Sequence, residues 1–340
     1  MMEQMKILLA GGTLSEEDMI LVMRQILNGR VSEDRIFDFL NAFGGRDETI
    51  EEITGAVRVM REQLDPITAP YGTMDCCGTG GDMSGTYNIS TAVALVLAGC
   101  EVPVAKHGNR AASSKSGAAD ILEALGVNLK LSKGAIETAL KQFHFAFLMA
   151  PYHHTGLKYV ASVRKKIGRR TIFNLLGPLA NPAGARRQLI GVYDKKLLVP
   201  FAQVLKNLGS KKAWIVHGTD GLDEITTTGP THIAILDDEG HISERTLTPE
   251  DFGVPVTTPE SLKGGNAEEN ASALRAILEG QKSAYRNIVC VNSAAGLVMH
   301  GKAQTLGEGM ELAKNALDNG AARHVLKDYI AFSREMRETS

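Results

Sequence analysis

The pattern of apolar residues changes near Thr73, and this change constrains the fold more than any other feature of the chain. Before it, apolar residues recur at helical spacing; after it, short apolar runs typical of buried strands alternate with segments of helical length. Such alternation is typical of a largely parallel sheet covered by helices. With 340 residues, the chain is long enough for two domains. We expect an α/β protein with a small all-helical N-terminal domain, residues 1–70, and a larger α/β domain with a mostly parallel central sheet, residues 71–340.

Three helices are expected in the N-terminal part. Ser15 and Ser32 each precede an apolar run at helical spacing, so each is predicted to cap a helix, the first ending at Gly29 and the second at Gly44-Gly45. A third helical run extends over residues 50–64. Three short helices bury little surface alone, so another segment or a second subunit is expected to cover their apolar faces.

The second part of the chain is expected to alternate strands with helices, and the last ninety or so residues to be mostly helical. Strands are predicted at 74–77, 102–106, 146–150, 189–193, 213–217 and 232–236, and helices at 90–98, 117–125, 133–143, 195–208 and 268–278. Loops that follow strands of an open α/β sheet share one crevice, at the carboxyl ends of the strands.

Three segments suited to binding phosphate lie within about thirty residues of each other. Gly78-Thr79-Gly80-Gly81-Asp82 allows backbone N–H groups to approach a phosphate closely. Asn88-Ile89-Ser90-Thr91 opens an apolar run and is expected at a helix N-terminus, where anions are favoured. Lys106-His107-Gly108-Asn109-Arg110 adds side-chain donors. Two such loops in tandem indicate a ligand with two separate phosphate groups.

An acidic pair, Asp223-Glu224, follows the strand predicted at 213–217. Adjacent carboxylates in a loop are commonly just solvated, but Mg²⁺ prefers one or two carboxylates together with phosphate oxygens. A bisphosphorylated ligand would bring more negative charge than the protein's formal −2, so Lys106, Arg110 and Lys115 alone would not neutralise it.

Two further features each allow a structural and a functional interpretation. Arg164 lies near the end of a predicted helix and is either an exposed basic residue at the helix C-terminus or a planar donor for a carboxylate. His153 and His154 are adjacent and point apart, so they form a poor metal pair and are expected to be structural or capping residues.

Composition excludes several classes of protein. Lys and Arg number 37 against 39 Asp and Glu, which argues against a dedicated nucleic-acid binder. Cys76, Cys77, Cys100 and Cys290 fit no zinc or redox spacing and are expected to be reduced thiols of a cytoplasmic protein. No signal peptide is visible, and no apolar run is long enough for a bilayer.

Together these motifs resemble anthranilate phosphoribosyltransferases over roughly residues 10–335. The resemblance rests on the three phosphate-binding segments above and on Ser113-Ser114-Lys115-Ser116-Gly117, the segment from Arg170 to Leu179, and the segment from His217 to Glu224. It implies transfer of a phosphoribosyl group from 5-phosphoribosyl 1-diphosphate (PRPP) to the amine of anthranilate, with release of pyrophosphate, in tryptophan biosynthesis. It also implies dependence on Mg²⁺, with two ions per site, a helical domain completed by helices around 155–185, and a homodimer formed through that domain.

The resemblance also assigns site residues by position. Anthranilate would contact Gly78, Asn109 and Arg164, with Arg164 on its carboxylate, and the metal ligands would be Ser90, Asp223 and Glu224. The residues expected to bind PRPP are Gly78, Gly81, Asp82, Thr86, Asn88, Ile89, Ser90, Thr91, Lys106, His107, Gly108, Asn109, Arg110, Ala111, Ala112, Ser113, Ser114 and Ala118.

Three positions depart from the family pattern. Ala118 stands where a serine is usual, which removes a hydroxyl contact worth about 1 kcal/mol. Tyr87 replaces a common phenylalanine. Thr155-Gly156 replaces Pro-Ala, which predicts a looser segment near the anthranilate entrance.

Anthranilate's aromatic amine is neutral at pH 7, so catalysis is expected to consist of positioning and stabilisation of the leaving charge. No catalytic nucleophile and no covalent intermediate are expected, and a proton relay through His107 is not expected to be needed. Two alternatives stay open at this point: a pyrimidine-nucleoside phosphorylase, which would use inorganic phosphate, and a non-catalytic relative that binds nucleic acid, which would need a basic surface stripe.

Overall fold

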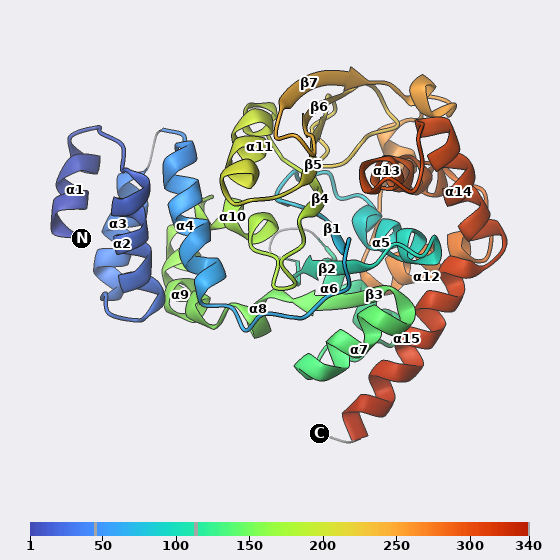
Figure 1. Ribbon diagram of the computed structural model, residues 1–340, viewed down its shortest axis with the longest axis horizontal. Coiled ribbons are helices and arrows are strands. Elements are labelled where there is room, and N and C mark those ends of the chain that lie inside the picture. The colour runs from blue at the N-terminus through green and yellow to red at the C-terminus, as the bar shows by residue number, and fades with distance from the viewer. Residues whose placement is uncertain (44–45, 112–114, 339–340) are drawn as a thin grey trace.

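The chain forms a helical bundle at one end and an α/β body at the other (Figure 1). The computed structural model describes residues 1–43, 46–111 and 115–338. The loop expected to end the second helix at Gly44-Gly45 lies outside the described residues, as do Ala112, Ser113 and Ser114 of the expected PRPP site.

The N-terminal bundle contains α1 (Met2–Leu9), α2 (Glu16–Leu27), α3 (Glu33–Ala42) and α4 (Ile50–Glu62). The predicted Ser15 cap is confirmed, because its side chain accepts a hydrogen bond from the backbone nitrogen of Asp18. Ser32 occupies the cap position of α3, but its side chain makes no cap hydrogen bond, so that part of the prediction was wrong. α1 was not predicted; its short apolar stretch carries little helical signal without the contacts it makes with α3.

Helices from later in the chain cover the bundle. α9 (Lys158–Ile167) packs against α3, and α11 (Leu198–Asn207) packs against α4. One continuous apolar core therefore joins buried bundle residues such as Phe39 and Ile53 to Ile190 and Ile215 on the sheet.

The described residues form a seven-stranded sheet with the order β3-β2-β1-β4-β5-β6-β7. The strands are β1 (Met74–Gly78), β2 (Val104–Gly108), β3 (Phe145–Met149), β4 (Arg187–Gly191), β5 (Lys212–Gly218), β6 (Thr231–Leu236) and β7 (Ile242–Leu247). The first five in this order are parallel, while β6 and β7 pair antiparallel. The predicted fold class is confirmed.

The antiparallel edge of the sheet differs from the sequence expectation. β6 was predicted as one more strand of the alternating pattern, but no helix lies between β5 and β6 to carry the chain back for a parallel crossover. β7 was missed because the residues between Ile242 and Leu247 are polar and exposed, as suits an edge strand.

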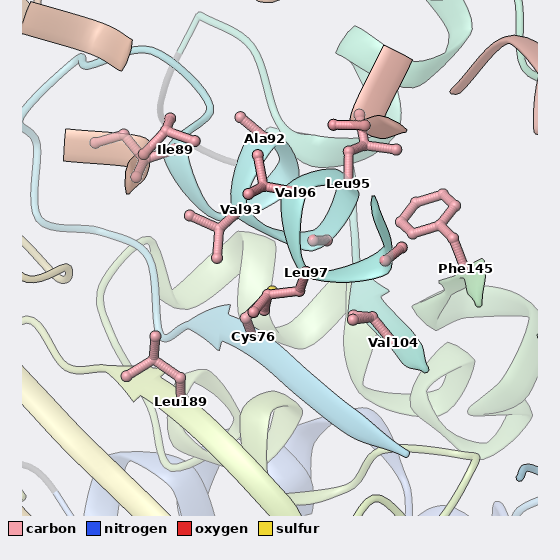
Figure 2. Close-up of a cluster of buried hydrophobic side chains, with 14 of the residues drawn as sticks. Cys76, Ile89, Ala92, Val93, Leu95, Val96, Leu97, Val104, Phe145 and Leu189 are labelled. Carbon is pink, nitrogen blue, oxygen red and sulfur yellow. The ribbon is translucent and has the colours of Figure 1, made fainter. Parts of the chain in front are cut away.

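Successive side chains on each strand point to opposite faces of the sheet, because a strand has a two-residue period. Leu189 and Trp214 belong to the core on one face, and their neighbours Ile190 and Ile215 to the core on the other. The first core lies beneath α5 (Ile89–Gly99), where Val93 and Val96 lie above Cys76 of β1 and Val104 of β2 (Figure 2).

The other helices complete both layers around the sheet (Figure 1). They are α6 (Ala118–Leu125), α7 (Lys133–Phe143), α8 (Ala150–His153), α10 (Phe173–Leu176), α12 (Ala267–Leu278), α13 (Ala284–His300), α14 (Leu306–Asp318) and α15 (Ala321–Glu338). Within the described ranges, no helix combines the length and the apolarity that crossing a bilayer would require. Cys76, Cys77, Cys100 and Cys290 are all free, as expected.

Candidate active site

A glycine-rich loop follows β1, at the edge of the sheet where the parallel strands end. Gly80 and Gly81 have φ angles of +65° and +74°, a region that side chains rarely tolerate. At Gly78, an added Cβ would lie 2.3 Å from Asp223 Oδ2, so only glycine fits beside that carboxylate. The loop is therefore bare backbone at the crevice, as phosphate binding requires.

The loop and the acidic pair hold each other. The backbone nitrogen of Gly80 donates to Asp223 Oδ2 at 2.8 Å, although the two residues are far apart in the chain. Thr79 is fixed from the neighbouring strand, since its nitrogen donates to the carbonyl of Gly191 at 2.9 Å. The glycine loop after β1 and the segment after β5 thus meet at one edge of the sheet, as expected for segments at the carboxyl ends of strands, and the end of β4 joins them there.

Three carboxylates gather here with one buried cation. Burial, followed by the proximity of Asp82, raises the pKa of Asp223 above its ordinary value. Burial and the charge of Asp223 raise the pKa of Glu224 well above its ordinary value, and the Lys106 charge opposes this shift. Burial and mutual repulsion thus disfavour the ionised form of these carboxyl groups. A bound divalent cation would neutralise their charges, so the cluster is suited to hold one.

Lys106 links the acidic cluster to the second phosphate-binding segment. It is only 2% exposed, and its Nζ donates to the carbonyl of Cys76 at 2.8 Å and to Ser90 Oγ at 3.2 Å. Ser90 in turn offers its backbone N–H to Glu224. Ser90, Lys106 and Glu224 therefore lie together, which brings an expected metal ligand from α5 to the acidic pair.

The segment Asn88 to Thr91 opens α5, as predicted from its sequence. Asn88 stands at the cap position but does not cap: its Nδ2 donates to the carbonyl of Ser116, and its Oδ1 accepts from Asn270 Nδ2 at 3.0 Å. The N-terminus of α5 is thereby tied to the loop before α6. The buried hydroxyl of Thr91 has no hydrogen-bond partner.

Thr86 and Tyr87 lead into α5. The ring of Tyr87, where the family commonly has phenylalanine, stacks on Tyr285 with ring centroids 4.4 Å apart. Thr86 forms a bridge with Lys263, whose Nζ donates to the carbonyl of Ser84. This lysine holds the segment between the glycine loop and α5, and it was not predicted because it lies in a segment without any motif.

The segment after β2 is arranged by α6. The Arg110 guanidinium donates to Asp120 and Glu123, with Arg110 Nη2 lying 2.8 Å from Glu123 Oε1. Asp120 also accepts from the backbone nitrogens of Ala111 and Gly117. In this structure the charge of Arg110 is therefore paired with carboxylates of α6, and its expected contact with PRPP stays a prediction.

Gly108, Asn109 and Ala118 complete this part of the site. Asn109 is exposed, and its carbonyl accepts from the backbone nitrogen of Ala119 at 3.2 Å. Ala118 is the first residue of α6, and an added Cβ on Gly108 would lie 3.2 Å from its side chain. The methyl group of Ala118 therefore faces the end of β2.

A histidine pair lines the floor of the site. His107 Nδ1 lies 3.1 Å from the carbonyl oxygen of Gly177, and His107 Nε2 lies 3.2 Å from His154 Nε2. Burial lowers the pKa of His107 to about 3 and that of His154 to about 4, so both rings are neutral. His107 then donates from Nδ1 to Gly177, which leaves the lone pair of its Nε2 facing His154. His154 is therefore structural, as expected, although its partner is a site residue.

Asp75 of β1 helps to hold His107 of β2 in place. This buried carboxylate accepts from the backbone nitrogen of His107 at 3.2 Å and from Asn181 Nδ2 at 2.8 Å. It fixes the position of His107 relative to β1. Its signal in the sequence, one acidic residue in an apolar strand, was not recognised.

Arg164 lies on α9 with its guanidinium 5.8 Å from the centroid of the Phe173 ring. Burial lowers the pKa of Arg164, and no described acidic residue pairs with it. It is therefore not the exposed basic helix end of the simpler interpretation. Phe173 begins α10, which ends next to Gly177, and the carbonyl oxygen of Gly177 contacts His107. Arg164 is thereby linked to the histidine pair through α10.

The departure at Thr155-Gly156 does not loosen its surroundings as predicted. Gly156 is buried, and an added Cβ would lie 2.9 Å from the carbonyl oxygen of Leu27 and 2.7 Å from Gln63 Oε1. The missing side chain allows α2 and the end of α4 to approach this segment closely.

Arg170 contacts the glycine loop, a role that the sequence interpretation did not give it although it begins a quoted motif. Its guanidinium donates to the carbonyl of Gly81 and lies 3.7 Å from the centroid of the Tyr193 ring. It connects the segment after α9 to the glycine loop.

Comparison with known proteins assigns both parts of the chain to a family. Residues 3–64 match the glycosyl transferase family helical bundle domain, and residues 70–323 match the glycosyl transferase family a/b domain. An anthranilate phosphoribosyltransferase of Azospirillum brasilense is 55% identical over 324 residues, covering 95% of this chain and 90% of the relative. The chain belongs to the anthranilate phosphoribosyltransferase family.

Solved structures of relatives agree with this assignment. The anthranilate phosphoribosyltransferase of Thermus thermophilus superposes with a TM-score of 0.91 at 41% identity, over 97% of this chain and 99% of the other. The Saccharomyces cerevisiae enzyme in complex with PRPP and Mg superposes with a TM-score of 0.89 at 28% identity, over 98% of both chains. The expected activity, anthranilate phosphoribosyl transfer in tryptophan biosynthesis, is confirmed, and the phosphorylase and nucleic-acid alternatives are set aside.

Proposed function

We propose that the 5-phosphoribosyl group passes from PRPP to the amine of anthranilate in the crevice at the carboxyl ends of β1, β2 and β5, releasing pyrophosphate. The observation that carries this proposal is the hydrogen bond between Gly80 and Asp223 at 2.8 Å, together with the contact of Lys106 with Ser90 at 3.2 Å. These contacts bring the glycine loop, the start of α5 and the acidic pair to one place. No other described part of the chain combines bare backbone donors, a buried lysine and clustered carboxylates.

Within this crevice, PRPP would lie between the glycine loop and the segment after β2. Gly78, Gly81, Asp82 and Thr86 line one side, and Lys106 to Ala111 with Ala118 line the other. The start of α5, Asn88 to Thr91, would receive the pyrophosphate group, because free N–H groups at a helix N-terminus favour an anion. Arg110 would have to leave Glu123 before it could contact a phosphate.

Ser90, Asp223 and Glu224 are proposed to hold magnesium, in two ions per site. The carboxylates fit this role because burial and mutual repulsion already raise their pKa values, a situation that a divalent cation relieves. Bound Mg²⁺ would supply charge neutralisation of the departing pyrophosphate. The protein's own contribution is to hold the partly buried carboxylates close together and to place Lys106 beside them.

Anthranilate is proposed to bind with its carboxylate on Arg164 and its ring near Gly78 and Asn109. A half-buried guanidinium without an acidic partner is a strong site for a planar carboxylate, because it can donate two parallel hydrogen bonds. The histidine pair beneath the site is neutral, so it does not protonate the amine of anthranilate. Catalysis then rests on placing the two substrates against each other and on stabilising the leaving charge.

The helical domain, residues 1–70 completed by the segment 155–185, is proposed to form a homodimer in the cytoplasm. Met2 and Leu9 of α1 are each 73% exposed, and Leu21 of α2 is 51% exposed. Apolar side chains on neighbouring helices of a small bundle are typical of a surface that a second subunit covers.

The assay that tests the function mixes purified protein with PRPP, Mg²⁺ and anthranilate and follows the loss of anthranilate fluorescence. Loss that needs all three components is expected. Turnover that proceeds without PRPP, or that inorganic phosphate and a pyrimidine nucleoside can replace, would contradict the proposal.

A further inference from the structure

A pocket of about 390 Å³ opens at the edge of the sheet opposite the active-site crevice. It lies where the chain enters β1, β4 and β5, between the segment Ala69 to Thr73, the segment Ala183 to Arg187, and Lys211. Parallel strands end at one edge and begin at the other, so the pocket is separated from Gly78 and Asp223 by the full length of the strands. It is no part of the site described above.

The walls of this pocket carry an excess of positive charge. Arg186, Arg187 and Lys211 line it, and Asp238 is the one acidic lining residue among those described. Asp238 is already engaged, because its Oδ2 lies 3.4 Å from Nζ of the neighbouring Lys212. A protein of net charge −2 thus concentrates unneutralised cations in one cavity.

Several hydrogen-bond donors of these cations are unused. Arg187 Nε is buried and has no hydrogen-bond partner, and neither Arg187 nor Lys211 forms an ion pair within the described ranges. Arg186 directs Nε and Nη2 at a single carbonyl, that of Gly209. Nε itself is enclosed by protein, so the donors open to a ligand are the terminal nitrogens of Arg187 and Nζ of Lys211, which make no hydrogen bond within the described ranges.

The neighbouring titratable groups do not cancel this charge. Asp237 lies on the same turn as Asp238, but its carboxylate accepts from the backbone nitrogens of Glu239 and His241, which hold it within the turn. His300 lies behind the pocket, with Nε2 3.1 Å from the carbonyl oxygen of Gly72, and burial lowers its pKa. It is therefore neutral at pH 7.

The aromatic ring of Tyr71 also lines the pocket. Tyr71 is 94% exposed, and the Arg187 guanidinium lies 5.9 Å from the centroid of its ring. The cavity volume falls in the range of small-molecule pockets, roughly 300–1,000 Å³, and is larger than a bare inorganic anion needs.

We propose that this pocket is a second binding site, for a small organic molecule that carries several negatively charged oxygen atoms. Arg187, Arg186 and Lys211 would donate to its oxyanion groups, and Tyr71 would cover its carbon skeleton. Phosphate monoesters and polycarboxylates share this chemistry. The site does not depend on the residues of the reaction crevice, so it stands or falls separately from the proposed function.

Isothermal titration calorimetry of the full-length protein with glycerol 3-phosphate and with citrate tests the proposal and distinguishes the two sources of oxyanion. One equivalent of at least one probe is expected to bind, more weakly as salt is added. Arg187→Gln is expected to weaken binding about tenfold or more, as loss of a charge-assisted hydrogen bond would. Lys211→Gln is expected to weaken it less, because that side chain is exposed.

Lys327→Gln, on exposed surface of α15, is the matched control and should bind as the unaltered chain does. Lys211→Gln also guards against misfolding, since an exposed lysine outside the core can be changed without disturbing the packing. Phosphoribosyl transfer should be retained in both pocket variants. Absence of binding for both probes at millimolar concentration overturns the proposal, as does binding that Arg187→Gln and Lys211→Gln leave unchanged.

Discussion

Asp223 Oδ2 accepts the backbone N–H of Gly80 at 2.8 Å, so a proposed metal ligand occupies a donor of the proposed phosphate loop. A phosphate oxygen that takes this N–H must release Asp223, and the released carboxylate is then free for the cation. We therefore expect substrate binding and metal binding to be coupled through this hydrogen bond.

Asp223→Asn and Asp223→Ala separate the two functions of this carboxylate. The asparagine keeps an acceptor for Gly80 but loses the charge, so we expect turnover to fall by roughly 10²- to 10³-fold, the size of a lost electrostatic contact in a transition state. Because the buried repulsion with Asp82 and Glu224 is relieved, Asp223→Asn should unfold in denaturant no more easily than the unaltered chain. Asp223→Ala should lose turnover and also stability. The measurement is a magnesium titration of kcat beside urea unfolding, with Asp328→Ala on the surface of α15 as the control; an unchanged magnesium requirement in both variants would contradict the metal assignment.

Arg164→Ala should raise KM for anthranilate by about 10- to 100-fold and leave KM for PRPP within a few-fold, because one charge-assisted contact to a carboxylate is lost. Steady-state kinetics with each substrate varied in turn checks this. Lys165→Ala, at an exposed neighbouring position, should change neither constant. Equal increases of both KM values would show that Arg164 acts through the fold and not on anthranilate.

Local signals in the sequence were enough to predict the α/β body and the convergence of Gly78, Lys106 and Asp223. Each glycine-containing segment directly follows a strand, and parallel strands can end only at one edge. The Ser15 cap succeeded for the same reason, since its partner Asp18 is three residues away. Features whose interacting residues are close together in the sequence could therefore be predicted from it.

What the sequence did not reveal depends on partners far along the chain. Arg110 was expected among the residues that bind PRPP, and nothing in its local sequence indicated that its guanidinium donates to Glu123 of α6. β7 carries no apolar alternation, and only pairing with β6 makes it a strand. Arg170 belonged to a recognised motif, yet its role follows from the position of Tyr193, which no local pattern encodes.

Arg170→Ala should raise KM for PRPP more than KM for anthranilate, because the glycine loop loses its anchor at Gly81. The effect should be roughly 10- to 30-fold, since a hydrogen bond and a cation–π contact contribute about 1 kcal/mol each. Arg170→Lys, which keeps the charge over Tyr193, should recover part of the loss. Arg169→Ala, whose side chain donates instead to Asn41, is the control. A fall in kcat with both KM values unchanged would contradict a role in holding the loop.

Leu21→Glu should convert the proposed homodimer to a monomer, because a charge would be buried in an apolar interface. Light scattering coupled to gel filtration measures the mass of each species in solution. Val256→Glu, a change at another exposed apolar residue far from the N-terminal helices, should leave the mass unchanged. An unaltered chain that elutes as a monomer, or a Leu21→Glu variant that stays dimeric, would place the interface elsewhere or remove it.

The buried histidine pair predicts a loss of stability in acid that can be assigned to two residues. Folding lowers the pKa of His107 to about 3 and that of His154 to about 4, from an ordinary value of 6.5. Between 6.5 and these values the unfolded chain binds more protons than the folded one, so the free energy of unfolding falls as the pH falls. Each histidine contributes a slope of up to about 1.4 kcal/mol per pH unit below 6.5 and none at higher pH. Urea unfolding at pH 7 and pH 5 should therefore show a smaller difference in His154→Gln than in the unaltered chain, whereas His324→Gln, at an exposed position of α15, should keep the full difference. Equal differences in all three proteins would mean that the pair is protonated in the folded state, and the neutral floor proposed for the anthranilate site would then be wrong.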